Sequence, residues 1–168
     1  MVARRHGVDL HTTGDGNPGA WNALEQLGGR RAWPAFIGDA LKGLLAGGAG
    51  WLIGGDVATA YAGVAGAMLG HALPALDRLR GGKAVMTFVG GMFAVALLST
   101  AAALAVCVVV SFAARSFAIG ARVGIVCVPI FQAVLDGPRR VIATGVLMCL
   151  IGLLFLVRRG GDRAAAAD

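Results

Sequence analysis

The sequence has little charge and few aromatic side chains. Of its 168 residues, 14% are Asp, Glu, Lys or Arg, 7% are aromatic, and only one is tyrosine. Hydrophobic residues make up 57%, and the mean hydropathy is +0.75. Soluble domains carry about 25% charged residues and lack long apolar runs, so the composition excludes an ordinary soluble domain. It predicts an all-α fold, a polytopic transmembrane helical bundle.

Cysteine is equally scarce, and its placement argues against a metal centre. Cys107, Cys127 and Cys149 each lie alone in an apolar run, without CxxC spacing or a neighbouring histidine. We therefore expect packing roles for them and no zinc site built on cysteine. The net charge of +6 does not indicate a nucleic-acid partner, because basic residues follow the ends of apolar runs and form no stripe with interleaved aromatics.

The apolar runs predict six membrane spans. A hydrocarbon core about 30 Å thick takes roughly 20 residues of helix, and shorter spans are tolerated where they pack against protein. The first residues lack an apolar stretch and predict neither a signal peptide nor an earlier span. We expect one membrane domain, with a glycine-rich loop at 1–31, the bundle at 32–157 and a tail at 158–168. The predicted spans are 32–54, 57–76, 84–98, 99–114, 119–135 and 141–157.

The basic residues predict the topology. Of the 15 Lys and Arg residues, all but Lys42, Arg139 and Arg140 fall on one side of the six-span arrangement. Basic residues gather in cytoplasmic loops. We therefore expect a multi-pass protein of the cell (plasma) membrane with both termini cytoplasmic. Two glycine-rich loops, residues 14–22 and 70–84, fall on the same side.

Two features inside the spans predict packing. Asp39 and Lys42 lie three residues apart on one helix face, and we predict an ion pair that supports the bundle. Small residues also recur every four positions, which lets membrane helices approach closely. The stripes leave the oligomeric state open. They include Gly43 and Gly47, Gly50 and Gly54, and Gly66 and Gly70.

The two glycine-rich loops, GDGNPGAWN and GHALPALDRLRGGKA, are the polar exceptions in the chain. Consecutive N–H groups in a glycine-rich turn form a concave site for anions, because glycine adopts positive φ freely. Asn17 and Asn22 add neutral donors, and Lys83 adds a positive charge suited to phosphate. We predict that the loops bind phosphate at the cytoplasmic membrane surface. The alternative for each loop is a tight surface turn.

The order of these loops, with DALKG at 39–43 and ARSFAIGA at 114–121, resembles the acyl-phosphate:glycerol-3-phosphate acyltransferase (PlsY) family of bacterial membranes. That family has about seven spans with its motif loops on the cytoplasmic side, and the six spans here begin where its second would begin. The resemblance implies acyl transfer from acyl-phosphate to the 1-hydroxyl of glycerol 3-phosphate. The products are phosphate and lysophosphatidic acid, which stays in the membrane lipid for phospholipid biosynthesis. No cofactor is implied.

The resemblance also implies roles for particular residues. Lys83 would be the catalytic, phosphate-binding cation, and His71 would support it by orienting the second loop. Asp39 and Lys42 would support the site from the first span. Phosphate binding is implied for Gly16, Asn17, Gly19, Asn22, Gly81, Gly82, Lys83 and Arg115, and Pro74 also matches the second motif.

Some positions depart from the family pattern. Asp15 and Ala118 stand where the family has serine, and Glu25 stands where it commonly has arginine. These residues motivate an alternative, a catalytically degenerate family member that acts as a lipid- or partner-binding membrane protein. A small transporter or channel is disfavoured, because a conduction path needs polar residues through the bundle, and only Asp39 and Lys42 qualify.

Overall fold

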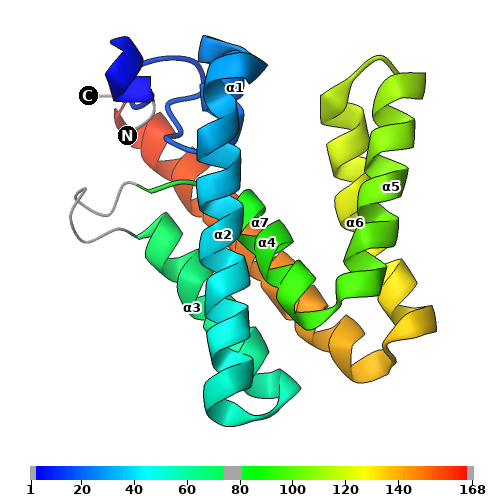
Figure 1. Cartoon of the computed structure of the whole chain (residues 1–168). Helices are drawn as coiled ribbons and strands as arrows, with labels where there is room; N and C mark the ends of the chain where they lie inside the picture. The colour runs from blue at the N-terminus through cyan, green and yellow to red at the C-terminus, as the bar shows by residue number, and fades with distance from the viewer. Residues whose placement is uncertain (1–2, 74–80, 166–168) are drawn as a thin grey trace.

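The computed structural model describes residues 3–73 and 81–165, with side chains up to Leu156. The described residues form helices and no strands, so the predicted all-α bundle is confirmed. Figure 1 shows their arrangement. The elements are the 3-10 helix η1 (Ala3–His6) and the α-helices α1 (Ala20–Leu27), α2 (Gly29–Gly54), α3 (Val57–Ala72), α4 (Val85–Val95), α5 (Leu97–Ala113), α6 (Phe117–Leu135) and α7 (Pro138–Ala165).

Helices α2 to α7 lie where the six spans were predicted. By length and composition, α2, α6 and the segment Pro138–Leu156 of α7 are each long and apolar enough to cross a membrane, whereas α4 and α5 are shorter apolar helices. Residues 1–31 were expected to be a loop, but they contain η1, α1 and the start of α2. The predicted end of the second span, together with Pro74, Arg78 and Arg80, lies outside the described residues.

The boundary between the third and fourth spans was wrong by a few residues. The chain breaks at Ala96, with φ −152° and ψ 64°, and not at Ser99 and Thr100. Both residues lie within helix α5, and both hydroxyl groups have hydrogen-bond partners. Thr100 Oγ1 donates to the Ala96 carbonyl at 2.8 Å, and Ser99 donates to the carboxylate of Asp136. The hydroxyls therefore do not interrupt the helix.

The helices form two groups (Figure 1). Helix α2 packs against α3 and α4, and α5 pairs with α6 as an antiparallel hairpin that stands apart from α2. Helix α7 runs behind α4 and contacts both groups through α3 and α6. Helix α1 and the α5–α6 turn lie at one end of the bundle, and the α2–α3, α4–α5 and α6–α7 turns lie at the other.

Close backbone contacts hold α2 against its neighbours. A Cβ atom added at Gly43 would collide with the carbonyl oxygen of Thr87 in α4, and one at Gly50 would collide with the carbonyl of Thr59 in α3. These parts of the small-residue stripes are confirmed. Gly66 and Gly70 make no such approach within the described residues, where a Cβ atom at either position meets no atom within 4 Å.

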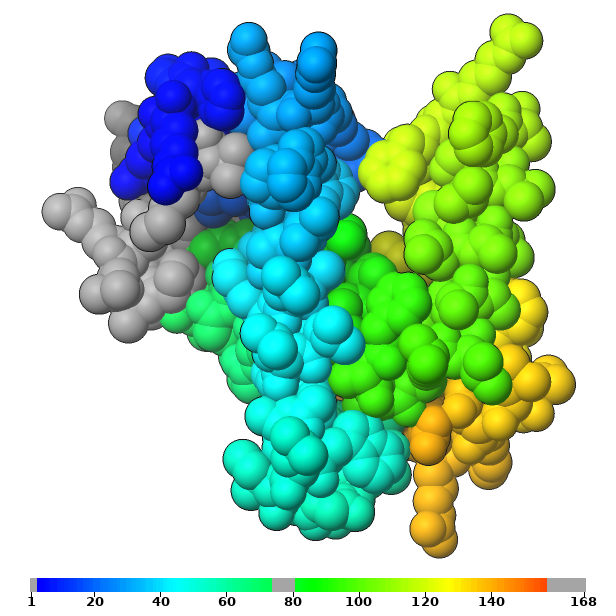
Figure 2. All heavy atoms as spheres, in the orientation of Figure 1, coloured from blue at the N-terminus to red at the C-terminus, as the bar shows by residue number. Residues whose placement is uncertain are grey.

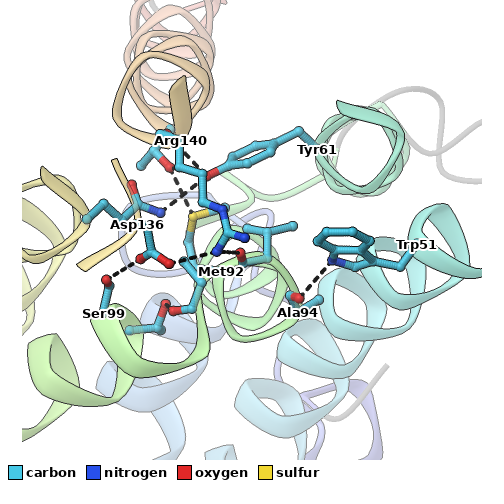
Figure 3. A network of polar contacts seen from close by, with 12 residues as sticks. Trp51, Tyr61, Met92, Ala94, Ser99, Asp136 and Arg140 are labelled. Carbon is cyan, nitrogen blue, oxygen red and sulfur yellow. Dashed lines mark hydrogen bonds and ion pairs between the residues drawn. The ribbon is translucent and has the colours of Figure 1, made fainter. Parts of the chain in front are cut away.

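A polar network fastens the end of the bundle opposite α1 (Figure 3). Arg140 Nη1 donates to the Val95 carbonyl at 2.8 Å and to Asp136 Oδ1 at 2.7 Å. The same carboxylate accepts from Ser99 on α5. The Tyr61 hydroxyl on α3 donates to the Arg140 carbonyl at 3.2 Å and lies 2.8 Å from Thr144 Oγ1 on α7. Arg140, an exception to the predicted charge pattern, therefore serves internal contacts that join α3, α4, α5 and α7.

Replacing Gly43 with alanine is expected to destabilise the bundle. The new methyl group forces α2 away from the α4 backbone, and overpacking of this kind costs about 1–3 kcal/mol. Gly48→Ala is the matched control, because Gly48 lies on the same helix and a Cβ there meets no atom within 4 Å. Thermal unfolding in detergent should show a lower midpoint for Gly43→Ala alone. Equal midpoints for the two variants would contradict the close α2–α4 contact.

Candidate functional site

The first glycine-rich loop is held together by Asn22. This side chain is fully buried, and its Nδ2 donates to the carbonyls of Leu10 at 3.1 Å, Thr13 at 2.8 Å and Asn17 at 3.1 Å. Three backbone carbonyls that converge on one amide fix the path of the loop, because each loses water on burial and needs a partner. Asn22 thus lies beneath the loop, while Gly16 is exposed with φ +68°.

The two glycine-rich loops meet directly. A Cβ atom at buried Gly82 would collide with His71 Nε2 and would lie 3.2 Å from the Cα atom of Gly19. Only glycine permits this approach. The Gly81 N–H donates to the Ala72 carbonyl at 3.1 Å, which ties the second loop back to the end of α3.

An ion pair joins the loops beside this contact. Lys83 Nζ lies 2.8 Å from Asp15 Oδ2, and the side chains are 22% and 38% exposed. The other oxygen, Asp15 Oδ1, accepts the Asn17 N–H at 3.1 Å and so shapes its own loop. Lys83 Nζ also lies 4.4 Å from the centre of the Phe155 ring on α7. Lys83 therefore touches both the first loop and the last helix.

Asp39 on α2 organises a second charged cluster. Its Oδ1 lies 2.9 Å from Lys42 Nζ and 3.4 Å from His71 Nδ1. The predicted pair of Asp39 and Lys42 is confirmed, and His71 joins it from the end of α3. Since the other ring nitrogen of His71 faces Gly82, the imidazole connects α2 to the second loop.

The two acids Asp15 and Asp39, together with His71 and Lys83, line a cavity of about 530 Å³. The rest of its wall is largely apolar and comes from α4, α5, α6 and α7. Figure 2 shows the recess between α1 and α2 on one side and the α5–α6 hairpin on the other. The polar end includes Asp15, Asn17, Gly19, Asp39, His71 and Lys83, and the apolar wall includes Val89, Leu104, Ile125, Val128, Ile151 and Phe155.

Three aromatic rings cover the cavity where α1, α2 and α6 approach one another. Trp21 stacks on Phe117 with the ring centres 5.7 Å apart, and Phe36 meets Phe117 edge-on at 6.3 Å. The indole Nε1 of Trp21 donates to Glu25 Oε1 at 2.8 Å. Glu25 is exposed and does not line the cavity, so its negative charge lies outside the candidate site.

The two arginines in and just after the segment 114–121 have other positions relative to the cavity than the sequence predicted. Arg115 is exposed, has φ 49° and does not line the cavity. Arg122, one of the basic residues assigned to topology alone, does line it. The sequence offered one indication of this position. Arg122 comes four residues after Ala118, which also lines the cavity, and residues four apart share a helix face.

Comparison with known proteins identifies the family of this chain. The family model described as "Glycerol-3-phosphate acyltransferase" matches residues 1–162. The chain is 41% identical over 138 residues to the glycerol-3-phosphate acyltransferase of Clostridioides difficile (strain 630), covering 79% of this chain and 68% of the relative. It is 34% identical to the enzyme of the same name from Burkholderia pseudomallei (strain K96243), covering 96% and 80% of the two chains.

Solved structures share the fold. The crystal structure of PlsY, an integral membrane glycerol 3-phosphate acyltransferase, in its glycerol 3-phosphate form superposes with a TM-score of 0.77 at 24% identity, covering 99% of this chain and 83% of that one. The lysophosphatidic acid form gives a TM-score of 0.75 at the same identity and coverage. As the order of its motifs predicted, this chain is a membrane protein that belongs to the glycerol-3-phosphate acyltransferase family.

Proposed function

We propose that this protein transfers an acyl group from an acyl-phosphate to glycerol 3-phosphate and leaves lysophosphatidic acid in the membrane. The observation that carries the proposal is the two-part cavity, whose polar end lies between the glycine-rich loops and whose apolar wall runs along α4 to α7. A cavity of this kind suits a molecule with a charged head and a hydrocarbon tail. A relative that is 41% identical to this chain over 138 residues bears the name glycerol-3-phosphate acyltransferase.

The polar end supplies groups that bind phosphate. Lys83 provides a cation, and Gly19 stands at the start of α1, where no described side chain caps the helix. The first N–H groups of an uncapped helix attract anions, as the positive end of the helix dipole does. Glycerol 3-phosphate is fully hydrophilic, so we place its phosphate at Lys83 among the loops. The backbone near Gly19 would then face the phosphate that departs from the acyl group.

Catalysis in this proposal rests on positioning and charge stabilisation. The glycerol hydroxyl oxygen attacks the acyl carbonyl carbon, the bond from that carbon to the phosphate oxygen breaks, and the departing phosphate takes up the hydroxyl proton. Holding both substrates side by side makes the reaction effectively intramolecular. N–H groups and cations aimed at the departing phosphate stabilise the charge that develops there.

His71 has a supporting role in this scheme. Because its two ring nitrogens face Asp39 and Gly82, it orients the second loop for Lys83, and Lys42 completes the charge balance of Asp39. Asn22 and Gly16 shape the first loop, and Gly81 and Gly82 let the second loop approach it. Arg115 would contribute from outside the cavity, as a basic residue at the membrane surface.

The topology is part of the proposal. The loop-bearing end of the bundle, where α1 and the α5–α6 turn lie (Figure 1), would face the cytoplasm of a cell whose plasma membrane holds the protein. There glycerol 3-phosphate enters from water and the acyl-phosphate from the bilayer. Side chains of the basic tail, beyond Leu156, lie outside the described residues.

The direct test is phosphate release from a synthetic acyl-phosphate, with and without glycerol 3-phosphate, by the purified protein in lipid. We expect release that depends on glycerol 3-phosphate and forms lysophosphatidic acid. Lys83→Ala should lower kcat/KM for glycerol 3-phosphate by about tenfold or more, because a hydrogen bond between charged groups at its phosphate is lost. Arg139→Gln is the control, because Arg139 is exposed at the opposite end of the bundle.

The same experiment separates the alternative. If folded wild-type protein binds a lipid phosphate but releases no phosphate above the Lys83→Ala variant, acyl transfer is wrong. The degenerate, lipid-binding alternative would then hold. Folding is verified by the thermal midpoint of each preparation.

Asp15 offers a second test. The carboxylate of Asp15 forms an ion pair with Lys83 Nζ at 2.8 Å. A substrate phosphate that binds Lys83 must therefore displace this carboxylate. An exposed pair contributes about 0.2–1 kcal/mol, which corresponds to a change of up to about fivefold in affinity. Asp15→Asn keeps an oxygen to accept the Asn17 N–H but removes the charge, and it should lower KM for glycerol 3-phosphate by up to that factor. A KM that rises would show instead that Asp15 helps to bind the substrate.

A further inference from the structure

Among the described residues, four charged side chains line the cavity, and three of them are engaged in ion pairs. Asp15 pairs with Lys83 at 2.8 Å, and Asp39 pairs with Lys42 at 2.9 Å. Arg122 also lines the cavity, and it forms no ion pair with any residue in the described part of the chain. The residue is exposed. A guanidinium group without an acidic partner keeps its hydrogen-bond donors available for an anion. The cavity wall on α6 thus includes a positive charge that is not engaged in an ion pair.

We propose that Arg122 binds the phosphate of the acyl-phosphate donor, an inference that rests on the proposed function. Ile125 lies three residues beyond Arg122 on the same face of α6, and Val128 lies three residues beyond Ile125. Both line the apolar part of the cavity. Val128 lies about 9 Å further along the helix axis at 1.5 Å per residue. A hydrocarbon chain that lies along Ile125 and Val128 thus brings its attached phosphate to Arg122.

The two phosphates of the reaction need separate cations. Lys83 lies between the two glycine-rich loops, next to Asp15, where a hydrophilic substrate arrives from water. Arg122 lines the same cavity from α6, within the α5–α6 hairpin. A guanidinium group presents a planar fork of donors that matches phosphate, and it remains charged in apolar surroundings. Arg122 is therefore suited to the phosphate that carries the acyl chain.

The neighbouring position explains why arginine is useful here. Ala118 lines the cavity one turn before Arg122 and brings no polar group. Its family counterpart, by the resemblance, is a serine whose hydroxyl is absent in this chain. The long side chain of Arg122 provides donors on the same face of α6. Compared with the serine of the family, the hydrogen-bond donor of this chain thus lies one helical turn further along α6.

Steady-state kinetics with each substrate varied in turn tests the proposal. Arg122→Gln keeps a polar side chain but removes the charge. We expect KM for the acyl-phosphate to rise about tenfold or more, because hydrogen bonds to charged groups contribute about 1.5–3 kcal/mol, while KM for glycerol 3-phosphate stays within about twofold. Arg122→Lys should recover part of the loss. Arg139→Gln makes the same charge change away from the cavity and should alter neither constant.

A binding measurement makes the result independent of turnover. Dodecyl phosphate is an unreactive mimic of the donor, and its affinity is measured by titration calorimetry in zwitterionic lipid. Arg122→Gln should weaken this binding about tenfold and leave that of glycerol 3-phosphate unchanged. If the wild-type protein shows no turnover and Arg122→Gln still causes this loss, the proposed function is contradicted and the phosphate site is supported.

Other outcomes overturn the inference. Unchanged dodecyl phosphate affinity and unchanged KM in a folded, active Arg122→Gln variant would show that Arg122 takes no part in binding the donor. A rise confined to KM for glycerol 3-phosphate would assign Arg122 to the other substrate. If the effect of Arg122→Gln appears only in vesicles that contain anionic lipid, Arg122 binds lipid headgroups and not the donor.

Discussion

The candidate site depends on how closely α2 and α4 approach. Gly43 faces the Thr87 carbonyl of α4, and Gly90 of α4 faces the Ala40 carbonyl of α2, with no room for a Cβ atom at either glycine. Each glycine-rich loop leads into one of these helices, the first through α1 and the second directly at Lys83. Because the helices touch at backbone distance, the loops are brought together as well, and Gly82 can meet Gly19.

The cavity exists because the remaining helices pack elsewhere. The α5–α6 hairpin buries its small residues internally, since Gly120 and Gly124 face Ser111 and Cys107 on α5. At the end opposite α1, the contacts of Arg140 and Asp136 hold the α4–α5 break and the α6–α7 turn together (Figure 3). At the other end the backbones of the hairpin and α2 stand apart (Figure 1), and the rings of Trp21, Phe36 and Phe117 make contact across the gap. These three rings also line the cavity.

Local patterns in the sequence predicted the helices and one of the ion pairs. Long apolar runs located α2 to α7, and spacing alone paired Asp39 with Lys42. The sequence did not reveal the pairing of Asp15 with Lys83, because 68 residues separate the two partners and no periodicity relates them. The break at Ala96 was also hidden, since the hydroxyls of the next residues find partners inside the bundle and nothing polar marks the break itself.

Asp15 can be reconciled with an anion site on energetic grounds. A carboxylate beside a substrate phosphate is unfavourable by Coulomb repulsion, but Asp15 is 38% exposed and its partner Lys83 is 22% exposed. Pairs of this kind are screened by water and contribute at most about 1 kcal/mol. A phosphate that carries more charge than the carboxylate and gains N–H groups from the loops can displace it. Asp15 then moves toward solvent without leaving a buried charge behind, whereas Asp39, at 13% exposure, keeps its partners Lys42 and His71. Whether Asp15 opposes the binding of a phosphate therefore depends on how exposed its carboxylate is, and not only on its position in the first glycine-rich loop.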